Sequence, residues 1–268
     1  MSTSRTPFTV RPFLAVTAVL LLAPVRAHAV DGVIEINQAC VATGCFEGDT
    51  AGFPVVIGAA GSYRLTSNLE VPDADTSAVA VNASPVSLDL NGFAISGPTV
   101  CSGEPVTSCA PTGSGIGVSA GNGARIYNGT IRGMGSVGVS SGTDARQWDL
   151  VVTGNGGGGF SLSRGGSVRT STITFNGGRG VGATSGGGFA EVSGSTVRGN
   201  QQQGVDLSGG IVVENRIQNN GAEGLRSQTG GGDAGYASNV ITGNTGADVA
   251  GGNSMGCNVI GSSTVCAP

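Results

Sequence analysis

The sequence predicts an all-β fold, a single-stranded parallel β-helix (solenoid) of about nine coils with an N-terminal cap and local disulfides. An apolar position returns about every 22 residues, and an asparagine follows it at one fixed distance in five of six repeats. The apolar reference positions are Ile131, Val152, Ile173, Val197, Ile217 and Ile241. Because the repeat is too short for a crossover helix as well as its strands, each repeat predicts one coil.

Three short strands are predicted in each coil. The second strand contains the reference position, and the third contains an apolar residue eight positions later. The first strand contains sites seven and five positions before the reference, which are small or apolar apart from Gln147. We expect all these sites to point inward. Neighbouring coils would then pair their strands about 4.8 Å apart around one continuous core.

The recurrent asparagine predicts a ladder of side chains along the stack. Its members are Asn155, Asn176, Asn200, Asn220 and Asn244. Asparagine tolerates the left-handed backbone conformation of tight turns, and its amide can bond to the asparagine of the next coil. We therefore expect each of these residues to occupy a left-handed turn position.

The termini have their own signatures. Residues 1–29 have a basic start, an apolar run and a small-x-small site at Ala27-His28-Ala29, as in a secretory signal peptide. We expect an N-terminal cap at 30–60, the β-helix at 61–256 with a loop at 97–115, and a C-terminal cap at 257–268. The mature chain contains no apolar run long enough to span a membrane. The protein is therefore expected to be secreted, periplasmic or at the cell surface, with a transmembrane N-terminal anchor as the alternative.

The six cysteines fall into three close pairs, which predict the disulfides Cys40–Cys45, Cys101–Cys109 and Cys257–Cys266. Local pairing is expected because distant cysteines of a rigid solenoid cannot approach each other, and export favours disulfides. Metal binding is the alternative. It is disfavoured because the only histidine, His28, belongs to the signal and no C-x-x-C motif occurs.

Composition excludes several function classes. Without His28 the mature chain has no imidazole for Ser-His-Asp or Cys-His catalysis. The formal net charge of −4 gives no general field that attracts nucleic acid. We expect no cofactor, no metal and no nucleic-acid partner. Composition leaves the oligomeric state open.

The sequence resembles bacterial proteins with a right-handed β-helix region, a group related in fold to pectate lyases and to a periplasmic protein of copper-site maturation. The runs 88–97 and 128–133 and the later Asn/Gly-Val coils carry the resemblance, which covers roughly residues 60–260. It implies right-handed winding. It also implies that the sheet of first strands is the one that often faces polysaccharide in the pectate-lyase-like fold, although the fold alone does not give the activity.

The outward positions of three successive first strands form a candidate ligand-binding face. They hold Arg125, Tyr127, Arg146, Trp148 and Arg169. Aromatic faces stack on sugars and guanidinium groups match carboxylate or sulfate geometry, so the pattern indicates an acidic glycan. The alternative is that these side chains only pack across coils, with an arginine over Trp148 as a cation–π contact.

An enzyme would need more than this face. In the family that the sequence resembles, lyases use Lys or Arg as base with Ca²⁺ held by acidic residues, and hydrolases use clustered aspartates. By analogy the three arginines are possible bases, but the nearby carboxylates Asp144, Asp149 and Glu191 are poorly aligned for a calcium cage. We therefore expect a non-catalytic glycan-binding or structural cell-surface protein. A polysaccharide lyase or hydrolase acting on an acidic glycan is the alternative.

Two further features have less specific interpretations. Asp206 and Arg226 follow corresponding third-strand residues on adjacent coils and predict a weak surface ion pair. The loop at 97–115, closed by Cys101–Cys109, either borders a binding face or is a surface decoration.

Overall fold

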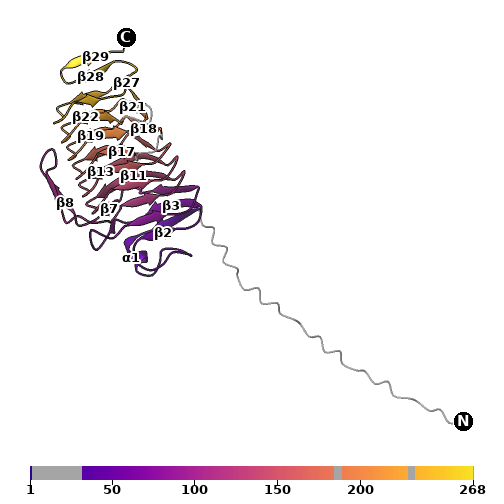
Figure 1. Cartoon of the computed structure of the whole chain (residues 1–268). Helices are drawn as coiled ribbons and strands as arrows, with labels where there is room; N and C mark the ends of the chain where they lie inside the picture. The colour runs from indigo at the N-terminus through magenta and orange to yellow at the C-terminus, as the bar shows by residue number, and fades with distance from the viewer. Residues whose placement is uncertain (2–31, 184–188, 229–232, 268) are drawn as a thin grey trace. The chain divides into compact units, whose positions relative to one another are not determined.

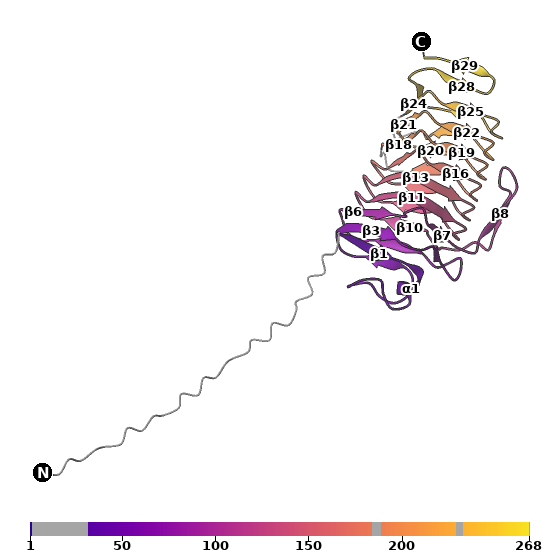
Figure 2. The same cartoon turned by 180° about the vertical axis from the view of Figure 1, so that it is seen from behind.

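The computed structural model describes residue 1 and residues 32–183, 189–228 and 233–267. The chain divides into the units Met1–Val30 and Asp31–Pro268. The predicted secretory signal, residues 1–29, lies outside the described residues except for Met1. The second unit is a parallel β-solenoid whose coils follow one another along one axis (Figures 1 and 2). The predicted all-β solenoid is thus confirmed.

The third strands form a parallel sheet of nine strands in chain order, one from each successive coil. Its members are β2 (Val55–Ile57), β5 (Val79–Val81), β10 (Val118–Ala120), β12 (Val139–Ser141), β14 (Phe160–Leu162), β17 (Val181–Ala183), β20 (Val205–Leu207), β23 (Leu225–Ser227) and β26 (Val249–Ala250). Each strand pairs in parallel with the strand one coil away, which is the register that the repeat predicts.

The first and second strands belong to a single sheet of 18 strands. The first strands are β1 (Val33–Ile36), β3 (Gly61–Leu65), β6 (Val86–Asp89), β11 (Arg125–Arg132), β13 (Arg146–Thr153), β15 (Ser167–Arg169), β18 (Ala190–Ser193), β21 (Gly210–Val213), β24 (Ala234–Ala237) and β27 (Asn253–Ser254). The second strands are β4 (Leu69–Glu70), β7 (Ala94–Ser96), β16 (Thr172–Thr174), β19 (Thr196–Arg198), β22 (Arg216–Gln218), β25 (Val240–Thr242) and β28 (Asn258–Ile260). The last strand of this sheet, β29 (Ser263–Val265), pairs antiparallel with β28. Strands β11 and β13 run through both positions of their coils and join the two series.

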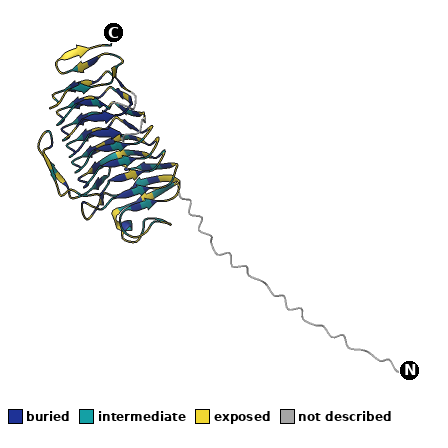
Figure 3. Ribbon diagram, in the orientation of Figure 1, coloured by how far each residue is buried: buried dark blue, intermediate teal, exposed yellow. Residues whose placement is uncertain are grey.

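The core lies inside the stacked coils, and buried positions (dark blue) alternate along the strands with intermediate (teal) or exposed (yellow) ones (Figure 3). All six reference positions are 0% exposed. This agrees with inward-facing residues at every second strand position. Gln147 is a polar residue at an inward position of a first strand: it is 1% exposed, and neither its Oε1 nor its Nε2 has a hydrogen-bond partner among the described residues.

The asparagine ladder runs through the buried turns that follow the second strands. Asn155 Nδ2 donates to Asn176 Oδ1 at 2.9 Å, Asn176 Nδ2 donates to Asn200 Oδ1 at 2.9 Å, and the same contact continues through Asn220 to Asn244. The left-handed conformation belongs to the residue before each asparagine, as at Gly154 (φ 65°), and not to the asparagine itself. The expectation of a left-handed asparagine was therefore wrong. The amide serves the ladder, and the preceding residue makes the turn.

A second polar ladder lies before the second strands and was not predicted. The backbone amide of Ser171 donates to Ser195 Oγ at 3.1 Å, and that of Ser195 donates to Asn215 Oδ1 at 2.9 Å. Asn215, Asn239 and Asn258 continue the column through their side-chain amides. Because the residue type changes from serine to asparagine along the column, the column is less regular in the sequence than the first ladder.

The two ends of the solenoid differ. At the N-terminal end lie α1 (Gln38–Val41) and the Cys40–Cys45 disulfide, and β1 and β2 already pair with β3 and β5. At the C-terminal end β29 turns back antiparallel on β28 beside Cys257–Cys266. Cys101–Cys109 joins the antiparallel strands β8 (Val100–Ser102) and β9 (Ser108–Ala110), so the three predicted disulfides all form. The boundaries proposed for the caps stay predictions.

None of the helices in the described part of the chain has the length and apolar character of a membrane span.

Candidate functional site

The predicted face lies on the outer side of three successive first strands. We call Arg125, Tyr127, Arg146, Trp148 and Arg169 the arginine face. Arg125 pairs with Arg146 and Tyr127 pairs with Trp148 across β11 and β13, and Trp148 pairs in turn with Arg169 of β15. The arginines are exposed and the aromatic residues half-buried. The strand register therefore brings all five side chains together.

The two aromatic rings of this face pack on each other. The centroids of Tyr127 and Trp148 are 4.5 Å apart and their planes differ by 4°, which is a stacked pair. One face of each ring is therefore covered by the other ring, as the cross-coil packing alternative requires. Each ring keeps one face that the other ring does not cover.

Two adjoining depressions hollow this face. The first, of about 400 Å³, is lined by Arg125, Arg146, Trp148 and Arg169, among others. The second, of about 370 Å³, shares Arg146, Ser167 and Arg169 with the first. Ser167 takes the outward position next to Arg146 on the following coil, so a short side chain follows two long ones. The surface at Ser167 therefore lies lower than the guanidinium groups beside it.

The charges of the arginine face are only partly balanced. Arg169 Nη2 lies 2.6 Å from Glu191 Oε2. Arg125 and Arg146 form no ion pair with any residue that the structure describes, although they are direct neighbours across two strands. Like charges in that arrangement repel each other. The predicted cation–π contact at Trp148 is not found in the described part of the chain, where the contact of this type is Arg198 over Phe175 at 5.6 Å.

The carboxylates near this face, those of Asp144, Asp149 and Glu191, do not form a metal-binding cluster. Asp149 is in a left-handed turn (φ 53°), and its Oδ1 accepts a hydrogen bond from Thr170 Oγ1 at 2.6 Å. Asp144 is in another left-handed turn (φ 56°), and Glu191 is paired with Arg169. Over the ranges that the structure covers, no three His, Cys, Asp or Glu residues are placed to hold a metal ion.

The disulfide-closed loop lies against the turns that follow the second strands. Glu104 pairs with Arg198, the amide of Val106 donates to the carbonyl of Gly199 at 2.9 Å, and Gln201 Nε2 donates to the carbonyl of Thr107 at 3.0 Å. Its base borders a depression of about 680 Å³ that also includes Arg132 and Phe175. The loop is thus fixed to later coils, along a side of the solenoid different from the arginine face.

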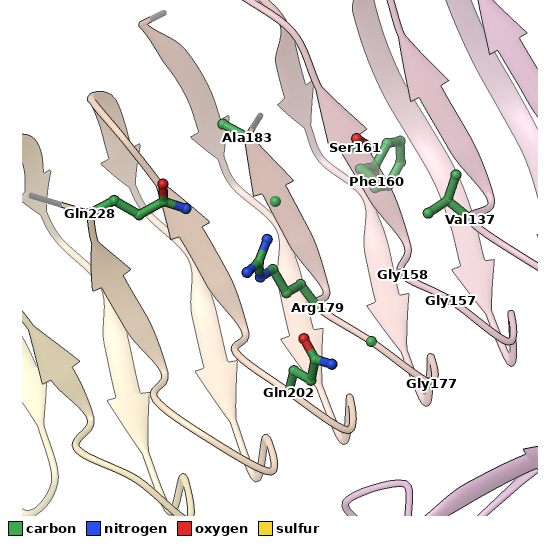
Figure 4. Close-up of a pocket in the computed structure, with 12 residues that line it drawn as sticks. Val137, Gly157, Gly158, Phe160, Ser161, Gly177, Arg179, Ala183, Gln202 and Gln228 are labelled. Carbon is green, nitrogen blue, oxygen red and sulfur yellow. The ribbon is translucent and has the colours of Figure 1, made fainter. Parts of the chain in front are cut away.

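A further depression, of about 540 Å³, lies beside the third strands and was not predicted (Figure 4). We call it the glycine depression. Polar side chains at its border are Ser161, Arg179, Gln202 and Gln228, and its glycines are Gly157, Gly158, Gly177, Gly178 and Gly182. It arises because glycines stand at neighbouring positions of adjacent coils, where side chains would otherwise cover the sheet.

Arg179 crosses this surface to a buried carboxylate. Its Nε lies 2.8 Å from Asp206 Oδ2 and donates to Gln203 Oε1 at 3.3 Å. A Cβ on Gly182 would come within 3.1 Å of Arg179 Cδ. Because Gly182 has no side chain, the Arg179 side chain can pass over it to reach Asp206. Arg226 binds the same carboxylate with two hydrogen bonds, from Nε at 2.9 Å and from Nη2 at 2.6 Å.

The predicted ion pair between Asp206 and Arg226 forms, but the Asp206 side chain is 0% exposed, so the expectation that the pair lies at the surface was wrong. Arg179 and Arg226 cover it from two coils. The hydrogen bond with this carboxylate raises the pKa of Arg226. In the same network Gln203 Nε2 donates to Glu223 Oε2 at 2.9 Å, and this hydrogen bond lowers the pKa of Glu223.

Comparisons with known proteins bear on the fold. Residues 114–264, more than half of the chain, match a family model described as a right-handed beta helix region. A search of curated proteins finds no match. Among solved structures, the A-module of the mannuronan C-5 epimerase AlgE6 from Azotobacter vinelandii is similar with a TM-score of 0.38 and 16% identity, over 81% of this chain and 68% of that one. The family match supports the right-handed winding that the resemblance implied.

Proposed function

The chain belongs to the right-handed β-helix family, and from this premise we propose that it is an exported, non-catalytic protein that binds an acidic glycan at the arginine face. The observation that supports the proposal most is the pair Arg125 and Arg146. These exposed guanidinium groups are adjacent, have no counter-ion among the described residues and line one depression with Trp148. Two neighbouring carboxylate or sulfate groups of a ligand would relieve their repulsion.

The arrangement of the face favours a chain that lies along the solenoid axis. Neighbouring coils are about 4.8 Å apart, so the backbone positions that carry Arg125 and Arg146 lie at that spacing. The two depressions continue in the same direction past Ser167. The exposed edge of the Tyr127–Trp148 stack adds an apolar wall on which a sugar ring can pack.

Binding is favoured over turnover because the carboxylates of Asp149 and Glu191 already have partners. Asp149 accepts a hydrogen bond from Thr170, and Glu191 is paired with Arg169. A carboxyl group that acts as general acid or base must reach the substrate atom that it protonates or deprotonates. Export is supported by the secretory-type residues 1–29 and by the three disulfides, which persist in oxidising compartments.

A glycan array probed with the mature chain, residues 30–268, tests the proposal. We expect binding to uronate-containing or sulfated polymers, and weaker binding by Trp148→Ala because the wall of the depression is lost. Phe175→Ala, an aromatic truncation outside the arginine face, is the matched control and should bind like the wild type. An array without acidic ligands, or equal binding by Trp148→Ala, contradicts the proposal. Release of shorter or unsaturated oligosaccharides from a bound polymer would show a lyase or hydrolase instead.

A further inference from the structure

The glycine depression has the features of a ligand site that is separate from the arginine face. It is built on the third strands and the turns before them, whereas the arginine face is built on the first strands. Its volume of about 540 Å³ lies within the range of about 300–1,000 Å³ that is typical of small-molecule sites. Figure 4 shows Arg179, Gln202 and Gln228 around it, with Ser161 on the neighbouring coil.

Arg179 is held in a fixed position at this depression. Its Nε is engaged by Asp206 and Gln203, and both of these residues are buried. Neither of its Nη atoms has an acceptor among the described residues, and the side chain is 40% exposed. A guanidinium group that is already immobilised loses little conformational entropy when it binds a ligand.

The charges behind the depression cancel. Arg179 and Arg226 carry two positive charges, and Asp206 and Glu223 carry two negative charges, so the sum is zero. This surface consequently has no net attraction for a polyanion, unlike the arginine face. The remaining polar groups, the amides of Gln202 and Gln228 and the hydroxyl of Ser161, combine donors and acceptors. Such a mixture matches the hydroxyl groups of an uncharged sugar.

We propose that the glycine depression is a second carbohydrate site, which takes a short neutral oligosaccharide and acts independently of the arginine face. The glycines allow a sugar ring to approach the backbone, and Arg179 with the two glutamines supplies its hydrogen bonds. The proposal does not depend on acidic-glycan binding at the first strands.

Binding of the mature chain to an array of neutral oligosaccharides built from glucose, galactose, mannose and N-acetylglucosamine tests it. The probe variant is Ser161→Trp, which places an indole in the depression without touching Asp206. Ser119 occupies the corresponding outward position two coils earlier, outside the depression, so Ser119→Trp is the matched control. Thermal melting verifies that both variants are folded.

We expect the wild type to bind at least one neutral oligosaccharide. Ser161→Trp should weaken that binding at least about tenfold, and Gln202→Ala combined with Gln228→Ala should weaken it as well. Ser119→Trp, and Arg125→Gln combined with Arg146→Gln, should bind like the wild type. A wild type that binds nothing on this array, or equal binding by Ser161→Trp, overturns the proposal. Loss of neutral-sugar binding in the Arg125/Arg146 variant would place the site on the arginine face instead.

Discussion

Two surfaces of the solenoid carry neighbouring arginines, and they differ in what lies between the charges. Beside the third strands, Arg179 and Arg226 share the buried carboxylate of Asp206. On the first strands, Arg125 and Arg146 are direct neighbours without an ion pair in the described part of the chain. Two arginines that share a buried counter-ion stabilise the fold, because removing the arginines leaves the carboxylate buried and unpaired. An unshared pair costs stability and is typical of a binding surface.

Replacing both arginines of a pair tests this difference most strongly. Arg179→Met with Arg226→Met leaves the Asp206 carboxylate buried and unpaired, and we expect the free energy of unfolding to fall by about 3 kcal/mol or more. The matched change, Arg125→Met with Arg146→Met, should alter it by less than about 0.5 kcal/mol, since both side chains are exposed. Urea unfolding of the two double variants measures both values. Equal losses would remove the distinction between the surfaces.

Two buried glutamines, one near each arginine pair, allow the same comparison with a smaller expected change in the free energy of unfolding. Gln147, beneath the arginine face, has no partner for its amide among the residues that the structure describes, whereas Gln203 connects Arg179 to Glu223. Gln147→Leu should raise the free energy of unfolding by about 1 kcal/mol, because an unpaired buried amide is costly. Gln203→Leu should lower it by a similar amount. Destabilisation by Gln147→Leu in chemical unfolding would show that its amide has a partner, such as a buried water.

Glu223 gives the smallest effect, and it depends on pH. Its pKa is lowered from the ordinary 4.5 in the folded state, chiefly by the hydrogen bond from Gln203. A carboxyl group with a lowered pKa adds stability above its unfolded pKa and loses it as the pH falls through the folded pKa. The stability difference between wild type and Glu223→Gln should therefore shrink below about pH 4.5, by about 0.5 kcal/mol or less because the group is partly exposed. A difference that grows on acidification in unfolding experiments would contradict this.

The sequence predicted those features that repeat in every coil. Reference positions such as Ile173, the asparagine ladder and the outward register of the arginine face follow from one period, because stacking places equivalent residues in columns. The burial of Asp206 was missed because it depends on a contact that does not repeat from coil to coil: the Arg179 side chain passes over Gly182 and covers the carboxylate. The docking of the loop at 97–115 was missed for a similar reason, since Glu104 meets Arg198, a residue far away in the sequence.

The orientation of the two aromatic rings is a feature that the repeat does not predict. The sequence placed Tyr127 and Trp148 on one face, and the register agrees. It could not decide whether the rings face a ligand or each other, because side-chain rotamers are set by packing between coils. Their separation of 4.5 Å shows that they stack on each other, which leaves the arginines as the main determinants of the proposed site.

Calorimetric titration of the mature chain with a polyuronate, at low salt and at 0.15 M salt, tests the central proposal most directly. We expect binding that weakens as salt rises. It should also weaken at least about tenfold in Arg125→Gln combined with Arg146→Gln, since each charge-assisted hydrogen bond contributes about 1.5 kcal/mol. Arg216→Gln, which removes an exposed arginine of a second strand, is the control and should leave binding unchanged. Affinity that is unaffected by the double variant, or no heat of binding at low salt, would contradict the account.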